Sequence, residues 1–566
     1  MKVKKALALL LALVLTVGLL PGRALAADDD EFTTVNSLDE LFIAMDKGIE
    51  KIKLGRDITS NGNLPLDKKV TIDLDGHTWR ASKDTHVVGT KDGGNVTIQN
   101  GKVSVGISML GGSMTLKGLE IDNMVNCNGG KLVSMEDCII AGGNGDNYPQ
   151  GVYVREDSAV GTIKNCTINL TGNERPMPLV VEGGSIDTIE GCTITATNKG
   201  TENFFYAVDI SDGGSVGTIK DCTITANGKN YCVGIDIRES ASVKSIEGCT
   251  ITVKNTAAGD EHKFDDGIVV AGRLGMVKEC AITARSSISN YGKVDEISGC
   301  ILNAEYDCIS AQGSIGSILS NTMTATGTYG RGVEVTGSVG TVAYNNVVKA
   351  PGAFITLHEG GQIKLVNGNT GDSDIYIAEG GEISTISSNV LVGVANYGTI
   401  ALLGSNAFEE DVINEGTIKK TDDSSPVDSL DKSKWYYDAM AYAYDKNLTF
   451  GIPDNQFNPD DKLTRSMLTQ MLWNMEEWPA SKIGTFTDVE SGAWYRNSVS
   501  WAADEEIVTG YTDGSFKPDN NITREQVATI LYRYVKNSGG DVSKKADLSG
   551  YADASSISAY AREAMQ

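Results

Sequence analysis

The sequence contains few histidines, few basic residues and few long apolar runs. Its 566 residues include 4 His, and neither Cys-x-x-Cys pairs nor Cys/His clusters occur, which argues against a zinc-type metal centre. Asp and Glu number 74 against 49 Lys and Arg, so the net charge is -25. This acidic balance argues against nucleic acid and anionic membrane surfaces as partners. Residues 6–20 form the one long apolar run, so no membrane span is expected elsewhere.

The N-terminus has the layout of a secretory signal peptide. Three lysines in residues 2–5 precede the apolar run, and Ala24-Leu25-Ala26 supplies small residues for cleavage before Ala27. We therefore expect residues 1–26 to be removed on export, and no membrane span to remain after cleavage.

Glycine is abundant, with 64 residues, and marks the turns of a central repeat. The hexapeptide Ile163-Lys164-Asn165-Cys166-Thr167-Ile168 recurs at intervals of 20 to 31 residues, each copy after a Gly- or Ser-rich turn. Later copies begin at Ile189, Ile219, Ile246, Val277 and Ile297. Cys166, Ile168 and Leu170 alternate with polar residues, which is typical of a strand with one buried face. The repeat predicts a parallel β-solenoid over residues 52–419, with one coil per repeat.

This region resembles the right-handed parallel β-helices of pectate lyases, polygalacturonases and many bacterial surface proteins. The Ile-x-x-Cys-x-Ile pattern is similar to the Ile-x-x-Asn-x-Ile signature of such coils, and asparagine takes over at Asn321, Asn345 and Asn389. The resemblance implies a mainly β fold, but a fold of this kind does not specify a function.

A helix is expected to cap the solenoid within residues 27–51. Ser37 and Glu40 have the spacing of a capping box, and one apolar face is formed by Leu38, Leu41, Phe42 and Met45. Such a helix would cover the first coil and protect an open sheet edge. The first strands are expected at Lys51 to Leu54 and Val70 to Leu74.

Seven of the ten cysteines occupy one place in successive coils. These are Cys138, Cys166, Cys192, Cys222, Cys249, Cys280 and Cys300. Stacked strands lie about 4.8 Å apart, within the Cα range of a disulfide, but parallel side chains point the wrong way for bridging. We interpret them as buried thiols that act as small apolar residues. Disulfides, common in exported proteins, are the alternative.

Four aspartates are candidate catalytic residues. Aligning the coils places Asp209 beside Asp236, with Asp266 and Asp307 in the adjacent column. Lyases and hydrolases with β-helix folds act through such carboxylates, some with calcium, so calcium is the one cofactor considered. Arg238 and Lys263 would then supply a base or a charge clamp. The alternative is that these are ordinary turn-associated aspartates, since a register error of one residue would reverse their side chains.

A second repeat, with an offset of 59 residues, occupies the C-terminal part. Six residues, Trp435, Gly451, Phe457, Pro459, Thr464 and Arg465, recur as Trp494, Gly510, Phe516, Pro518, Thr523 and Arg524. We assign residues 429–478 and 486–538 to two copies, 548–566 to the start of a third, and 420–428 to a linker. Helical spacing from Trp494 to Ile507, and a capping box at Thr523 and Gln526, predict helix, loop and helix in each copy. In the first copy Met467 stands where the second copy has the glutamine. Because methionine cannot return the second hydrogen bond of a capping box, only the Thr464 half of the cap is expected.

The second copy resembles the S-layer homology (SLH) module, by which exported bacterial proteins bind polysaccharides attached to the cell wall. The resemblance is carried by Trp494-Tyr495, by residues 510–518 and by Ile522-Thr523-Arg524-Glu525-Gln526. It implies small all-α modules that bind secondary cell wall polysaccharide through the Thr-Arg motif, here Thr464-Arg465 and Thr523-Arg524. Because such modules usually act in threes, we expect the chain to continue beyond Gln566.

The residues themselves suggest how binding would occur. Arg465 and Arg524 each follow an N-cap, at the positive end of a helix dipole, where a guanidinium suits a carboxylate or pyruvate ketal. Alternatively, each arginine pairs with a carboxylate of the next module. Trp435 and Trp494 are either core anchors, the interpretation we favour from the sequence, or platforms on which a sugar stacks.

The sequence therefore predicts a secreted protein of the bacterial cell wall and surface. Its C-terminal modules would display a solenoid that binds external glycans or proteins. One alternative is a wall-anchored polysaccharide lyase or glycoside hydrolase, which we favour less because no convincing catalytic set is evident. Another is a structural subunit of a surface lattice.

Overall fold

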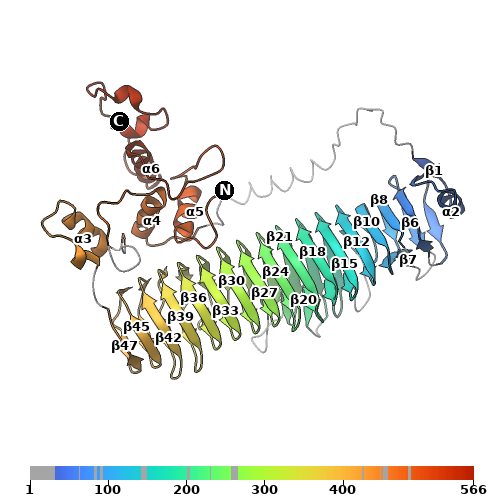
Figure 1. Ribbon diagram of the computed structural model, residues 1–566, viewed down its shortest axis with the longest axis horizontal. Helices are drawn as coiled ribbons and strands as arrows, with labels where there is room; N and C mark the ends of the chain where they lie inside the picture. The colour runs from blue at the N-terminus through green and yellow to red at the C-terminus, as the bar shows by residue number, and fades with distance from the viewer. Residues whose placement is uncertain are drawn as a thin grey trace.

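The computed structural model describes residues 32–62, 64–81, 86–89, 93–141, 149–200, 204–229, 231–255, 265–422, 426–446, 448–449, 457–481 and 486–566. The predicted signal peptide, Gly451 and Lys263 lie outside these residues. A long stack of strands forms the body of the molecule, with one helix at its N-terminal end and a group of helices along its flank and C-terminal end (Figure 1).

Three strands form each complete coil, as in β17 (Met177–Glu182), β18 (Ser185–Glu190) and β19 (Thr193–Asn198). They pair in parallel with the corresponding strands of the next coil, β20 (Phe205–Ser211), β21 (Ser215–Lys220) and β22 (Thr223–Gly228). The first strand of each coil belongs to a 16-stranded sheet, and the other two belong to two columns of a 32-stranded sheet. This arrangement confirms the predicted mainly β, parallel β-helix.

The 16-stranded sheet carries the aspartates and is named sheet B. Its strands are β4 (Leu64–Leu66), β7 (His86–Gly89), β9 (Gly106–Met109), β11 (Val125–Cys127), β14 (Gln150–Arg155), β17, β20, β23 (Cys232–Ile237), β26 (Asp266–Val270), β29 (Ser286–Asn290), β32 (Asp307–Ala311), β35 (Arg331–Val335), β38 (Ala353–Leu357), β41 (Ile375–Ile377), β44 (Val394–Asn396) and β47 (Ile413–Asn414). Alternate residues of these strands point into the core, so the residues between them form the outer face of sheet B.

The repeated hexapeptide forms a corner and not a single strand. In one coil, β15 (Ser158–Lys164) ends before the corner and β16 (Thr167–Gly172) begins after it. Between them Asn165 adopts a left-handed conformation, with φ of 52°, and Gly191 does the same one coil later, with φ of 64°. Gly tolerates this conformation better than other residues, which explains why it recurs at this place, at Gly248, Gly299 and Gly368.

From Cys138 onward, the residue after each corner points inward, and these residues form a polar ladder. From Cys138 to Cys300 it is a cysteine: the Cys192 N–H donates to the Cys222 sulfur at 3.4 Å, and the Cys222 thiol donates to the Lys220 carbonyl at 3.2 Å. All ten cysteines are buried and have free thiols, which confirms the interpretation as buried thiols.

In the C-terminal coils asparagine has the same role. The Asn321 N–H donates to Asn345 Oδ1 at 3.0 Å, and Asn345 Nδ2 donates to the Ile318 carbonyl at 3.0 Å. The Cys300 N–H donates to Asn321 Oδ1 at 2.9 Å, so the two halves of the ladder are joined. Asn369 and Asn406, which the sequence pattern did not single out, extend it.

The N-terminal cap is helix α2 (Leu38–Asp46). The Ser37 hydroxyl accepts a hydrogen bond from the Glu40 N–H at 3.2 Å, as expected. The Glu40 carboxylate accepts a hydrogen bond from the Asn36 N–H at 2.6 Å. The predicted apolar face packs into the solenoid core, with Leu41 fully buried. One strand was not predicted: β1 (Thr33–Val35) precedes the helix and pairs in parallel with β2 (Lys51–Leu54).

The C-terminal part forms three helical modules. The first contains 3-10 helix η1 (Pro426–Ser429), α3 (Tyr437–Asp445) and α4 (Arg465–Met475); the second contains α5 (Arg496–Asp504) and α6 (Arg524–Asn537); the third contains η2 (Ala554–Ser556) and α7 (Arg562–Met565). Residues of α4, α5 and α6 share one core, as expected of stacked repeats. Helix α5 ends three residues before Ile507, although Ile507 is buried as predicted.

The helical modules dock on the corners of the solenoid. The Ser320 hydroxyl donates to the Ala493 carbonyl at 2.8 Å, and Asn346 Nδ2 donates to the Trp478 carbonyl at 2.9 Å. In Figure 1, α4 and α5 accordingly lie beside the coils of β30 (Lys293–Ser298) and β36 (Ser338–Ala343). No local pattern predicts this contact, because its partners are more than a hundred residues apart.

Arg496 is the most buried cation of this contact, with 3% of its surface exposed. Its guanidinium packs over Gly299, where an added Cβ would lie 2.6 Å from Arg496 Cζ. Glu279 Oε1 lies 3.9 Å from Arg496 Nη2. Burial lowers the pKa of Arg496, so the contact depends on a close fit and on one nearby carboxylate.

No helix in the described residues is both long and apolar enough to cross a membrane.

Candidate functional sites

The two Thr-Arg motifs begin α4 and α6. The Thr464 hydroxyl accepts a hydrogen bond from the Met467 N–H at 3.2 Å without a reciprocal bond. Thr523 forms a full capping box with Gln526, with both bonds at 3.3 Å. The predicted complete and half-made caps are therefore both present.

Arg465 is largely buried, with 7% of its surface exposed. Its Nε donates to the Phe516 carbonyl at 2.8 Å, and its guanidinium lies 4.6 Å and 5.1 Å from the ring centres of Phe516 and Tyr511. Burial lowers the pKa of Arg465. The arginine therefore contacts the next module, as the alternative interpretation expected, but through a carbonyl and two rings and not through a carboxylate salt bridge.

Arg524 occupies the equivalent place in the second module and is exposed. Its neighbour Glu525 holds the third module, because it accepts hydrogen bonds from the Ser558 hydroxyl at 2.9 Å and the Tyr560 hydroxyl at 3.0 Å. Arg524 makes no hydrogen bond or ion pair with any residue that the structure describes. Its guanidinium is thus free at the N-terminus of a 14-residue helix.

The repeated tryptophans are surface residues. Trp435 is 88% exposed and Trp494 is 38% exposed. Each ring meets the following tyrosine edge-on, with centroid distances of 5.8 Å to Tyr436 and 5.2 Å to Tyr495. The favoured interpretation as a core anchor is wrong for Trp435, because the anchors of the shared core are other aromatic residues, among them Trp473, Trp501 and Phe516.

Tyr511 is a residue of this site that sequence reasoning did not single out. Gln526 Nε2 donates to its hydroxyl at 3.2 Å, and Lys517 Nζ lies 4.2 Å from its ring centre. The Tyr511 ring therefore lies between Lys517 and the buried guanidinium of Arg465, where the first and second modules meet. The sequence signal that could have pointed to Tyr511 was the glycine before it. Gly510 has a φ of 64° and turns the chain at this place.

The candidate catalytic aspartates lie on the outer face of sheet B in the predicted register. Asp209 pairs directly with Asp236. Asp266 pairs with Ser286, and Asp307 lies one coil further along the same row. The structure therefore brings the aspartates together in two short rows.

Two arginines form ion pairs with three of these four carboxylates. Arg238 contacts Asp209 at 2.8 Å and Asp236 at 3.1 Å. Arg331 contacts Asp307 at 2.7 Å.

Asp266 differs from the other three. It accepts a hydrogen bond of 2.6 Å from the Ser289 hydroxyl and has no ion pair with a described residue. Burial raises the pKa of Asp266, and also that of Asp209, to about 6. Asp266 is thus a carboxyl group that gains its proton close to neutral pH.

This arrangement suits hydrogen bonding better than bond cleavage. Glycoside hydrolysis needs an acid and a free carboxylate on either side of the scissile bond, whereas ion pairs engage three of the four groups here. Within the described ranges, no group of three or more His, Cys, Asp and Glu side chains is placed to hold a metal ion.

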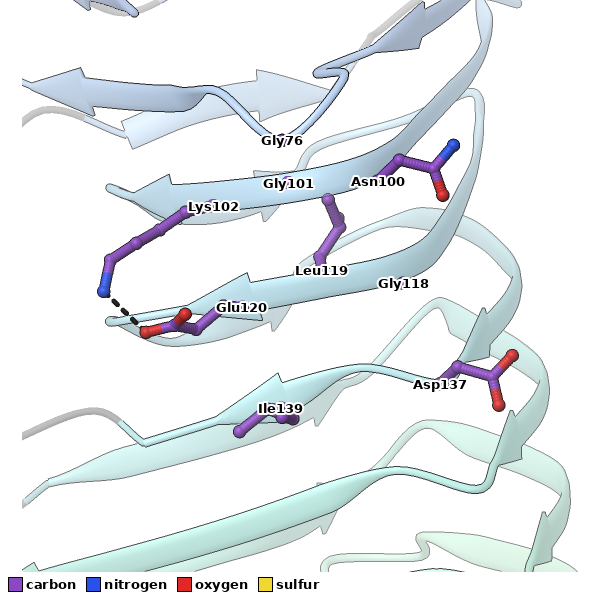
Figure 2. A pocket seen from close by; sticks show the side chains of 9 residues that line it. All are labelled: Gly76, Asn100, Gly101, Lys102, Gly118, Leu119, Glu120, Asp137 and Ile139. Atoms are coloured by element: carbon purple, nitrogen blue, oxygen red, sulfur yellow. Dashed lines mark hydrogen bonds and ion pairs between the residues drawn. The ribbon is translucent and has the colours of Figure 1, made fainter. Parts of the chain in front are cut away.

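A separate hollow of about 350 Å³ lies on the N-terminal coils, over β8 (Asn95–Ser104) and β10 (Ser113–Ile121). Figure 2 shows Lys102 and Glu120 joined across one end and Asn100 and Asp137 at the other. Lys102 Nζ contacts Glu120 at 2.6 Å and Asp122 at 2.9 Å, and these carboxylates raise its pKa. Because its lysine is already paired, we assign no chemistry to this hollow.

Comparison with known proteins identifies the helical modules. The family model of the S-layer homology domain matches residues 430–466 and 485–528. The C-terminal part of the chain therefore contains S-layer homology domains.

Three relatives show the range of proteins with which similarity is shared. An endoglucanase of Bacillus sp. (strain KSM-635) is 32% identical over 142 residues, covering 25% of this chain and 15% of that protein. A cellulosome-anchoring protein of Acetivibrio thermocellus is 30% identical over 94 residues, 16% of this chain and 21% of that protein. A surface-layer 125 kDa protein of Lysinibacillus sphaericus is 26% identical over 129 residues, 23% of this chain and 10% of that protein. The chain thus spans about a fifth or less of the length of these relatives.

Proposed function

Since the chain carries S-layer homology domains, we propose that it is a secreted protein of the bacterial cell surface. The domains hold it on the wall by binding secondary cell wall polysaccharide without a covalent bond, and the solenoid is displayed for binding external glycans. The observation that carries the proposal is the free guanidinium of Arg524, which follows the Thr523 cap at the start of α6.

Electrostatics favours an anionic group of the wall polymer at Arg524. The N-terminus of a helix carries a partial positive charge and unpaired N–H groups, and the guanidinium adds a full charge with planar donors. An acidic sugar substituent would meet both. The bulk negative charge of the chain does not oppose this, because the attraction is local and screened within about 8 to 10 Å.

The other predicted wall-binding residues divide into two roles. Trp435 and Trp494 expose aromatic surface on which a sugar ring can stack. Thr464 and Thr523 fix the helix ends, and Arg465 positions the loop of Phe516 through its hydrogen bond. We therefore place the polymer across the exposed arginine and tryptophans, with Arg465 as a positioning residue.

The docked modules also fix how the solenoid is presented. The Arg496 contact and the Ser320 hydrogen bond join the second module to the flank of the stack. A rigid mount of this kind would hold sheet B in one orientation relative to the wall, so that a ligand meets the same face on every copy.

A second candidate function is polysaccharide cleavage, which one observation favours. Asp266 has a pKa raised to about 6 by burial, as suits a general acid. Incubation of the protein with acidic and neutral polysaccharides tests this idea. An unsaturated product or a new reducing end that is lost in Asp266→Asn would support cleavage over binding.

The wall site is tested by binding to purified cell wall sacculi that retain their polysaccharide. We expect Arg524→Gln to weaken retention about ten- to a hundredfold, since one charge-assisted contact is worth roughly 1.5 to 3 kcal/mol. The matched control is Lys536→Gln, which removes one positive charge from the exposed last turn of the same helix. Equal loss in the two variants, or none in either, would overturn the assignment of Arg524.

A further inference from the structure

An aromatic pair, one ring exposed and the other half-buried, lies at the start of two neighbouring strands of sheet B. Phe204 and Tyr231 precede β20 and β23, and their ring centroids lie 4.2 Å apart with 29° between the ring planes. Phe204 is 49% exposed. Tyr231 has a φ of 35°, a left-handed conformation that a bulky residue rarely adopts and that costs of order 1–3 kcal/mol. The fold therefore tolerates backbone strain where it presents this surface.

A hydrogen-bonding set follows along β20 and β23, with Arg175 added from the segment before β17. Tyr206 and Asp209 of β20 lie on one face, because Arg238 contacts both. The guanidiniums of Arg238 and Arg175 lie 4.9 Å and 5.9 Å from the ring centre of Tyr206. From Phe204 to Asp209 the strand extends about 16 Å at its usual rise, which is long enough for an oligosaccharide.

Two buried polar atoms of this set lack partners. Asp209 is 6% exposed, and Arg238 binds its Oδ2, but its Oδ1 has no hydrogen-bond partner among the described residues. The buried Nε of Arg175 likewise has none there. An unsatisfied buried group costs about 1–3 kcal/mol, so an acceptor and a donor remain to be satisfied next to an aromatic surface.

The charges of the set favour an uncharged ligand. Two carboxylates already neutralise Arg238, and Asp266 adds a third carboxyl group in the next coil. Excess negative charge would repel an acidic glycan. A sugar hydroxyl, in contrast, can donate to Asp209 Oδ1 and accept from Arg175 Nε while a ring face stacks on Phe204.

We propose that the outer face of β20 and β23, with Phe204 and Tyr231 as platform and Asp209 and Arg175 as hydrogen-bonding groups, binds a neutral polysaccharide. This inference rests on the proposed role of the solenoid as a displayed, glycan-binding body and names the class of its ligand. Binding requires no covalent change and no metal ion.

The test uses the exported chain and three soluble neutral polysaccharides, mixed-linkage β-glucan, galactomannan and arabinoxylan, in affinity electrophoresis. Polygalacturonate and chitosan serve as the acidic and cationic probes. We expect retardation by at least one neutral polymer and a roughly tenfold loss of affinity in Phe204→Ala. Arg175→Gln, which keeps the side chain long and polar, should give a smaller loss.

Tyr376→Ala is the matched control, because Tyr376 is an exposed aromatic residue of β41 on the same sheet. It should leave affinity unchanged. Equal losses in Phe204→Ala and Tyr376→Ala, binding to the charged probes alone, or no binding to any neutral polymer would each overturn the proposal. Retention of the same preparations on sacculi tests the anchoring role separately. Failure of the neutral-polysaccharide proposal can therefore be distinguished from failure of the anchoring proposal.

Discussion

Replacing Asn345 by alanine tests whether the polar ladder holds the solenoid corners together. This amide is fully buried. It donates to the Ile318 carbonyl, to the Ala343 carbonyl and to Asn369, and accepts from the backbone N–H of Asn321, all at 2.9 to 3.1 Å. Alanine can make none of these bonds.

The expected cost follows from the groups left behind. The Asn321 N–H would be buried without an acceptor, at about 1–3 kcal/mol, and the lost side-chain atoms would add a small cavity. We therefore expect Asn345→Ala to destabilise this corner by about 3 kcal/mol. Asn345→Cys should cost about 1 kcal/mol, because a thiol occupies the same place in the N-terminal coils and makes weaker versions of the same bonds.

Local hydrogen exchange is the appropriate assay, because stacked repeats need not unfold in a single two-state step. At 1.4 kcal/mol per factor of ten, the Asn321 amide should exchange roughly a hundred times faster in Asn345→Ala and only several times faster in Asn345→Cys. Exchange that is unchanged in the alanine variant, or equally fast in both variants, would refute the reasoning that thiol and amide have one role.

Three further predictions follow from buried contacts. The free energy of unfolding should fall as pH rises from about 4 to 6, by up to about 3 kcal/mol from Asp266 and by a similar amount from Asp209, because the folded chain holds both protons more tightly than the unfolded chain; Asp266→Asn should remove about half of this slope in denaturant titrations, and an unchanged slope would argue against it. Arg496→Ala should undock the helical modules and raise the radius of gyration in X-ray scattering, whereas identical profiles would contradict the docking contact. Thr523→Ala should lower the stability of the second module by about 1 kcal/mol, and an unaltered melting curve would show that its cap contributes little.

Local patterns predicted most of the fold. The spacing of Ser37 and Glu40 and of Thr523 and Gln526 located two helix starts, because capping depends on residues three apart. The Cys-Thr-Ile repeat located the inward ladder, because alternation along a strand decides which side chains are buried. The aspartate register also followed, since coils of similar length align their strands.

Contacts between distant segments escaped the sequence analysis. Nothing local distinguishes Arg465, which is buried under the loop of Phe516, from Arg524, which is exposed. The burial of Arg496 depends on Gly299, almost two hundred residues earlier. Trp435 was misjudged for a related reason: a large apolar residue suggests a core, but the shared core of the modules is filled by other aromatic residues.

The anchoring role is tested most directly by comparing sacculi before and after removal of their secondary polysaccharide with hydrofluoric acid. The account predicts that the exported chain sediments with untreated sacculi, that it stays in solution with stripped ones, and that a chain ending before residue 429 binds neither. Equal sedimentation with stripped and untreated sacculi, or retention of the shortened chain, would contradict it.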